Sequence, residues 1–111
     1  LNIGAVAEAL ALAESAGVDP ARVRQALLGG FAASRILEVH GQRMIDGNFT
    51  PGGKVTTQHK DLRQALDLAA GLGLPLPATR LNMELYQTLI DSGDGALDHS
   101  ALIRLFRKSD C

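Results

Sequence analysis

Apolar residues recur every three or four positions along most of the chain, the spacing produced by one face of an α-helix. Between Leu1 and Gly17 the apolar positions at this spacing are Ile3, Val6, Ala7, Leu10 and Ala13. Polar residues are few in this stretch, so the expected helix is apolar on nearly all sides. A helix of that kind is covered on more than one side, either at the centre of the domain or against a partner subunit.

Turn and capping residues divide the next part of the chain into further helices. Asp19-Pro20 is typical of a helix start, and Gly29-Gly30 of a helix end. A third helix is expected from about Ala33 to Ile45, and Gly47-Asn48 closes it. Its expected inner face is made by Ile36, Leu37, His40, Met44 and Ile45. Residues 48–54 follow as an irregular loop rich in turn residues.

A fourth helix is expected after this loop. It begins between Val55 and Gln58, where Thr56 or Thr57 is available as an N-cap. Gly71 and Gly73 are expected to end it.

Two more helices are expected in the last third of the chain. Pro75 and Pro77 open a fifth helix, whose inward residues are expected to be Leu81, Leu85 and Leu89, with Tyr86 to one side. Asp98 is expected to cap the last helix. The pattern therefore predicts about six helices, no strand, and a single all-α domain.

The composition of the chain argues against several classes of function. The formal net charge is −1, and the largest basic cluster is Arg104, Arg107 and Lys108, which argues against a small helical DNA-binding domain. Glu8 and Glu14 interrupt the most apolar stretch, so no membrane span is expected. The single cysteine, Cys111, excludes an intrachain disulfide. These features are consistent with a cytoplasmic protein.

Candidate chemistry is sparse along the chain. His40, His59 and His99 lie far apart and lack the spacing of a metal-ligand set, so we expect surface or helix-end histidines and no metal site. No glycine-rich phosphate loop joins a strand to a helix. The most informative stretch is the loop 49–53 followed by Lys60, because a lysine early in a helix can direct its ammonium group at an anion or a hydroxyl. The simpler interpretation is that Lys60 solvates an exposed helix face.

Several short motifs, in this order and spacing, resemble the C-terminal domain of the β-hydroxyacid dehydrogenases. That group includes 3-hydroxyisobutyrate dehydrogenase and tartronate semialdehyde reductase (2-hydroxy-3-oxopropionate reductase). Each motif alone is weak, but together they span nearly the whole chain, and the last resembles the tartronate semialdehyde branch. The motifs are Leu1-Asn2-Ile3, Glu8-Ala9-Leu10, Ala16-Gly17-Val18-Asp19, Gly29-Gly30 with Ser34, Asn48-Phe49 with Pro51-Gly52, Lys60-Asp61-Leu62, Ala65-Leu66-Asp67, Leu76-Pro77, and Asp98-His99-Ser100-Ala101-Leu102.

The resemblance implies a fold, a cofactor and three site residues. The fold would be like the C-terminal domain of 6-phosphogluconate dehydrogenase, with a long first helix truncated at its N-terminal end. The cofactor of the complete protein would be NAD or NADP. Lys60 would contact it near the nicotinamide, Phe49 would lie at the mouth of the same cleft, and Ser34 would approach the substrate or simply belong to a helix–helix turn.

The resemblance also implies that much of the machinery lies elsewhere. The family's catalytic lysine and its dinucleotide-binding Rossmann domain would precede Leu1, so residues 1–111 would form one helical domain for substrate binding and dimerisation. We expect this chain alone to be inactive, because it carries no catalytic acid. The parent enzyme would reduce tartronate semialdehyde to glycerate, or act on another hydroxy or oxo acid of three to four carbons.

A different class of function remains open at this stage. The first helix, apolar on nearly all sides, also fits a non-catalytic helical domain that binds a partner protein. That alternative predicts no coupling to a nucleotide, even with a preceding domain restored. Because the chain begins at Leu1 inside an expected helix, without Met or a capping residue, we interpret it as a fragment or a processed product.

Overall fold

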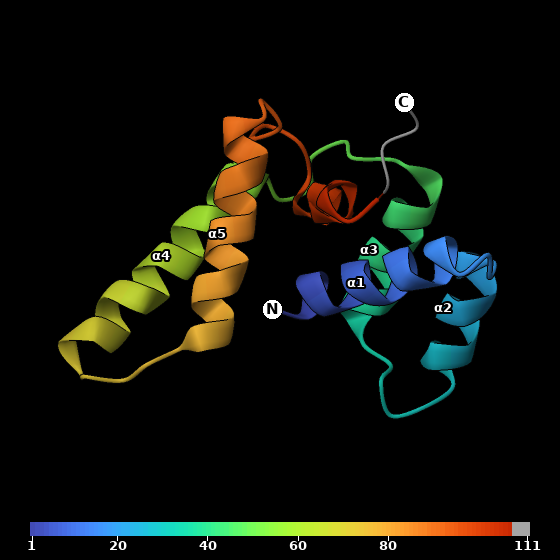
Figure 1. Ribbon diagram of the computed structural model, residues 1–111, viewed down its shortest axis with the longest axis horizontal. Coiled ribbons are helices and arrows are strands. Elements are labelled where there is room, and N and C mark those ends of the chain that lie inside the picture. Colours follow the sequence, from blue (N-terminus) through green and yellow to red (C-terminus); the bar gives the residue numbers. More distant parts are fainter. Residues whose placement is uncertain (108–111) are drawn as a thin grey trace.

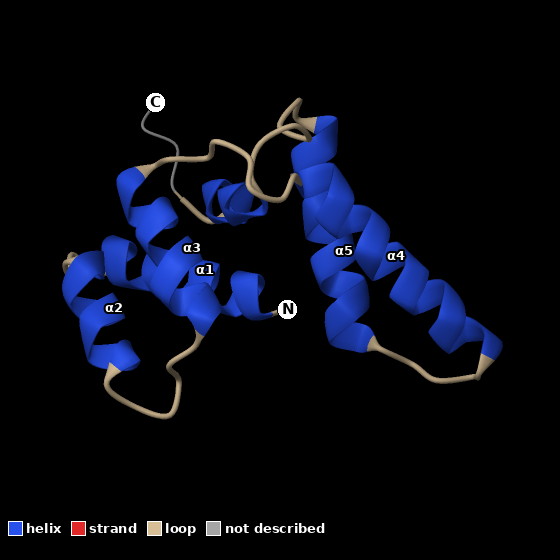
Figure 2. Ribbon diagram, turned by 180° about the vertical axis from the view of Figure 1, so that it is seen from behind, coloured by secondary structure: helices blue, strands red, loops and turns tan. Residues whose placement is uncertain are grey.

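The computed structural model of the chain describes residues 1–107, and this part is all-helical as predicted. Figures 1 and 2 show helices and loops with no strand in these residues, where the nearest approach to a sheet is an isolated bridge between Lys54 and Asp98. Six helices follow one another in the order α1 (Asn2–Ser15), α2 (Pro20–Leu28), α3 (Arg35–Asp46), α4 (Val55–Gly71), α5 (Pro77–Asp91) and the 3₁₀-helix η1 (His99–Leu105).

Local sequence signals set most of the helix ends. The Asp19 side chain accepts a hydrogen bond from the Ala21 N–H, and Pro20 occupies the first helical position of α2. The Ser34 hydroxyl accepts from the Leu37 N–H, so α3 begins at Arg35, slightly later than expected. Gly47 ends α3 with a φ of 66°, a left-handed conformation that glycine adopts without a steric penalty.

The helices form two groups, each with its own apolar core (Figure 1). The first group packs α1, α2 and α3 together around the buried residues Ile3, Val6, Ala7, Leu10, Ala11, Leu37, Met44 and Ile103. The second group is the antiparallel pair α4 and α5, packed around Val55, Leu62, Tyr86, Leu89 and Leu102. The two cores share the side chain of Phe106.

The short helix η1 connects the two groups. It contacts α1 and α3 on one side and α4 and α5 on the other. Its adjacent residues Leu102 and Ile103 are both fully buried, and they belong to different cores. Asp98, at its N-terminal end, caps it as predicted by accepting from the Ser100 N–H.

The structure corrects two expectations about α4 and α5. Tyr86 is buried, at 1% exposure, whereas Leu81 is 57% exposed, so the expected inner face of α5 was wrong at these positions. Tyr86 turns inward because η1 covers that face of α5 and the phenol donates a hydrogen bond to the His99 carbonyl. Neither threonine caps α4, because the carbonyls of Leu97 and Gly95 accept from its first N–H groups instead.

The apolar character of α1 is explained largely within the chain. Seven of its residues are buried, because α2, α3 and η1 all pack against it. No helix in residues 1–107 is long and apolar enough to cross a membrane.

Candidate functional site

The candidate site is built around the carboxylate of Asp98, which is fully buried at the start of η1. Its Oδ1 accepts hydrogen bonds from the N–H groups of Gly52, at 2.9 Å, and Gly53, at 3.2 Å. Its Oδ2 accepts from the N–H of Ser100, at 3.0 Å, and from the Ser100 hydroxyl. One side chain therefore fixes the loop before α4 to the beginning of η1.

Backbone pairing reinforces this junction. The Asp98 N–H donates to the Phe49 carbonyl at 2.9 Å, and the His99 N–H donates to the Gly53 carbonyl at 2.7 Å. Two segments about fifty residues apart in the chain thus run side by side for a short distance. The irregular loop expected at residues 48–54 is irregular in secondary structure but fixed in position.

Arg43 attaches α3 to the same junction. Its Nη1 lies 3.3 Å from Asp98 Oδ1 and donates to the Thr50 carbonyl at 2.7 Å. The arginine is partly exposed while the aspartate is buried, so the buried negative charge has a cationic partner. Three separate segments meet here: α3, the loop and η1.

Two opposing effects determine the pKa of Asp98. Burial alone would raise the pKa of this carboxyl, because water no longer solvates the charge. The hydrogen bonds from Ser100, Gly52 and Gly53 all favour the ionised form, and they lower the pKa to about 2. The carboxylate is therefore charged throughout the physiological range.

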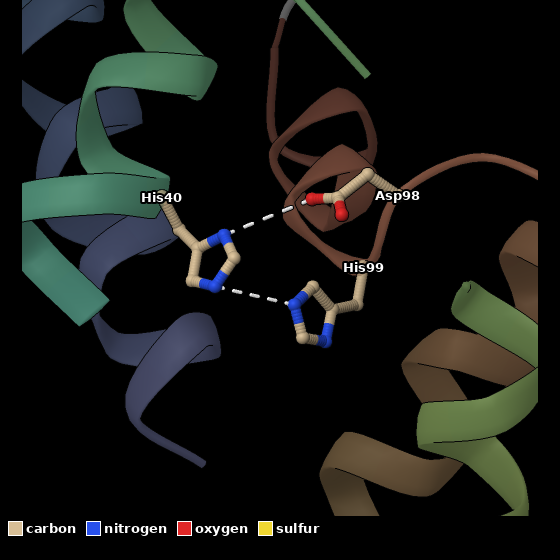
Figure 3. Close-up of side chains that lie close together, drawn as sticks. All are labelled: His40, Asp98 and His99. Carbon is tan, nitrogen blue, oxygen red and sulfur yellow. Dashed lines mark hydrogen bonds and ion pairs between the residues drawn. The ribbon is translucent and has the colours of Figure 1, made fainter. Parts of the chain in front are cut away.

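A pair of histidines borders this carboxylate (Figure 3). His40 on α3 and His99 on η1 bring their Nε2 atoms to 3.2 Å, with the ring planes almost perpendicular, at 88°. The other nitrogen of each ring, Nδ1, faces an oxygen. The His40 Nδ1 lies 3.7 Å from Asp98 Oδ2, and the His99 Nδ1 lies 3.4 Å from the Oε1 of Gln58 on α4.

Burial is the main influence on both imidazoles. It lowers the pKa of His99 and the pKa of His40 below the usual value, because the charged form loses solvation. The Asp98 carboxylate opposes this effect, and the Arg43 guanidinium adds to it. Both rings are accordingly neutral at neutral pH, and each offers one nitrogen lone pair.

The three residues expected at the site lie outside this cluster. Lys60 is exposed, and since it precedes buried Leu62 by two positions it lies on the side of α4 away from α5. Phe49 is partly buried and packs against the first core. Ser34 uses its hydroxyl to cap α3, which is the helix-turn role that sequence reasoning left open.

Sequence reasoning did not find the histidine pair. His40 and His99 are 59 positions apart, so no local spacing indicates that they meet. The available signals were indirect: His40 was placed on the inner face of its helix, and His99 follows the capping residue Asp98. A tertiary contact of this kind requires knowing which helices are neighbours.

The model of one protein family, described as "NAD-binding of NADP-dependent 3-hydroxyisobutyrate dehydrogenase", matches residues 1–106. The chain belongs to this family. It is 57% identical over 104 residues to a 2-hydroxy-3-oxopropionate reductase of Escherichia coli K12, covering 94% of this chain and 36% of that protein. The family's description agrees with the expected cofactor, NAD or NADP.

Two solved 3-hydroxyisobutyrate dehydrogenases of the family share the fold. One from Salmonella typhimurium superposes with a TM-score of 0.89 at 32% identity, covering 93% of this chain and 36% of that one. One from Mycobacterium tuberculosis, solved with L-serine, gives 0.82 at 25% identity, covering 97% of this chain and 40% of that one. The chain thus spans little more than a third of the length of these relatives.

The described residues do not form a complete dinucleotide site. Residues 1–107 contain no strand, and hence no strand–loop–helix cradle for a pyrophosphate. The Lys60 side chain is exposed and pairs with no carboxylate in this part of the chain, so its ammonium is available to a ligand. The Phe49 ring is partly buried and packs against the first core.

Proposed function

We propose that this chain is the helical C-terminal domain of an NAD(P)-dependent oxidoreductase that reduces tartronate semialdehyde to glycerate. The observation that carries the proposal is the 57% identity to the Escherichia coli reductase, because it extends over 94% of this chain. The relatives are more than twice as long as this chain, which supports a preceding Rossmann domain in the complete enzyme. In that arrangement, residues 1–111 close one side of the cleft.

The cofactor, when bound, supplies hydride chemistry, and this chain supplies position and shelter. The Lys60 ammonium, with three N–H donors, holds the nicotinamide end of the cofactor by charge and hydrogen bonding. The Asp98 junction fixes the loop that carries Phe49 and leads into α4, so this side of the cleft is rigid. The general acid is assigned to a lysine that precedes Leu1.

The first experiment is turnover by the complete enzyme. NADH and NADPH are each offered with tartronate semialdehyde and with methylmalonate semialdehyde, and loss of the reduced cofactor is followed by absorbance. The 111-residue chain is the control and is expected to be inactive. Turnover with tartronate semialdehyde supports the proposal. The absence of turnover with every pair contradicts it and favours a helical module that binds another protein.

Lys60 is tested separately in the complete enzyme. Lys60→Ala should raise the KM for the cofactor several-fold or lower kcat, whereas Lys60→Arg should retain much of the wild-type behaviour because the charge remains. Lys54→Ala is the matched control, since Lys54 is an exposed lysine six positions earlier. If Lys60→Ala behaves like Lys54→Ala, the role assigned to Lys60 is wrong.

We also propose that the complete enzyme self-associates through α1. Leu12 is 71% exposed on this helix and lines a shallow groove with Glu8, Ala11, Ser15 and Phe106. Leu12→Glu should shift the enzyme to a smaller species in light scattering. Leu72→Glu is the matched control, because Leu72 is also 71% exposed but lies after α4. An unchanged mass for Leu12→Glu would contradict this interface.

A further inference from the structure

The histidine pair directs one ring nitrogen of each residue at the other ring. Both Nδ1 atoms face oxygen acceptors, Asp98 Oδ2 for His40 and Gln58 Oε1 for His99. The His99 contact, at 3.4 Å, favours a hydrogen on that Nδ1, whereas the 3.7 Å from His40 Nδ1 to Asp98 is too long for a hydrogen bond. The two Nε2 atoms face each other across 3.2 Å, where a hydrogen on one of them makes an N–H···N bond. A metal ion can take the place of that hydrogen and accept a lone pair from each ring.

The separation of the two Nε2 atoms fits a metal ion. The rings are almost perpendicular, with centroids 4.5 Å apart, and their Nε2 atoms are the nitrogens that face each other (Figure 3). Two imidazole nitrogens bound to one tetrahedral Zn²⁺, each at about 2.0–2.1 Å, lie roughly 3.3 Å apart. The observed 3.2 Å matches that separation.

The surroundings of the pair also resemble those of metal-binding histidines. Such histidines generally direct the second ring nitrogen at a carboxylate or carbonyl oxygen, which fixes the ring and raises its basicity. Here Asp98 and Gln58 hold those positions. The His40 Nδ1 is buried without a hydrogen-bond partner, so a small rotation toward Asp98 would satisfy it.

We propose that His40 and His99 bind one divalent transition-metal ion of the Zn²⁺ class through their Nε2 atoms. Asp98 orients His40 and does not itself ligate, because both its oxygens already accept hydrogen bonds and Arg43 lies 3.3 Å away. The remaining coordination positions are left to water. A site with two protein ligands binds reversibly and is not a closed structural zinc site. Since His40 lies on α3 and His99 on η1, the ion would join the two segments.

The test is a titration of the 111-residue chain with ZnCl₂, followed by calorimetry and by thermal unfolding. All proteins carry Cys111→Ser, because Cys111 lies outside the described residues and a free thiol is itself a zinc ligand. We expect one Zn²⁺ per chain and a raised Tm, as for any ligand that binds the folded state. His40→Gln and His99→Gln should each weaken binding at least tenfold.

His59→Gln is the matched control, since His59 lies on α4 outside the pair, and it should bind like the parent. Co²⁺ provides a measurement that needs no variant, because its visible spectrum reports nitrogen ligation directly. Absence of Zn²⁺ binding and of a Co²⁺ spectrum would overturn the proposal. So would equal affinities in the His40, His59 and His99 variants.

Discussion

The guanidinium of Arg43 and the carboxylate of Asp98 lie 3.3 Å apart, and both side chains also hold the loop that precedes α4. The pair therefore does more than neutralise a buried charge. It brings α3, the loop and η1 to one point, and the loop's position determines where α4 begins.

Replacing Asp98 with Asn should lower the free energy of unfolding by about 2–4 kcal/mol. The amide keeps the size of the side chain, but it leaves Arg43 without its charged partner and weakens the hydrogen bonds from Gly52 and Gly53. Urea unfolding followed by circular dichroism measures the loss. Asp94→Asn is the control, because Asp94 pairs with Arg104 near the surface and should cost less than about 1 kcal/mol. Equal losses would contradict the role of Asp98.

Substitution of two leucines of α1 distinguishes the contribution of core packing to stability from that of helix propensity. Leu10 is fully buried and Leu12 is 71% exposed. Leu10→Ala should lower the free energy of unfolding by about 2–5 kcal/mol, because it leaves a cavity among α1, α3 and η1. At concentrations where the chain is monomeric, Leu12→Ala should change it by no more than about 0.5 kcal/mol. The same urea titration measures both free energies of unfolding. A large loss of stability in Leu12→Ala would mean that the Leu12 surface is covered in solution.

Ser34 can be assigned to structure or to substrate binding by two substitutions. Ser34→Ala removes the cap on the Leu37 N–H and should cost about 1 kcal/mol, whereas Ser34→Asp keeps an acceptor and should cost little. In the complete enzyme, a purely structural serine predicts a nearly unchanged substrate KM for Ser34→Asp. A KM that rises in both variants, despite the retained stability of the aspartate, would place the hydroxyl at the substrate.

Tyr86 should make the fold sensitive to alkali. Burial raises the pKa of its phenol well above the ordinary value of 10.0, and the Asp98 charge adds to this. The unfolded chain releases this proton near pH 10 and the folded chain does not, so the free energy of unfolding falls as the pH rises above about 10. Below that pH the contribution is complete.

The absorbance of tyrosinate tests this directly, because Tyr86 is the single tyrosine and the chain has no tryptophan. Ionisation should coincide with the loss of the helical circular-dichroism signal. Tyr86→Phe keeps the packing and removes the ionisable group, so it should unfold at a higher pH than the parent. Ionisation while the helices remain intact would show that water reaches the phenol.

The sequence predicted what depends on local chemistry. The cap at Asp19 and the glycine end at Gly47 follow from interactions within a few residues of the chain, and the apolar stripe of α1 follows from the spacing of its residues. The burial of Tyr86 and the exposure of Leu81 were not predicted, because they depend on whether η1 lies over that face of α5.

The same distinction applies to the candidate site. Asp98 was predicted as a helix cap, and it is one, but its bonds to Gly52 and Gly53 span more than forty positions. The approach of His40 to His99 is likewise a product of helix packing. Lys60 was singled out through family resemblance, since nothing local distinguishes an exposed helical lysine from any other.

Helix η1 contributes residues to both cores, and this determines how the domain unfolds. Leu102 completes the core of α4 and α5, and its neighbour Ile103 completes the core of α1 and α3. Neither half can open fully without releasing η1, and releasing it exposes apolar surface in both. The two halves are therefore coupled into one cooperative unit, and the deeply buried amides of α1 and α5 should exchange their hydrogens through the same global opening.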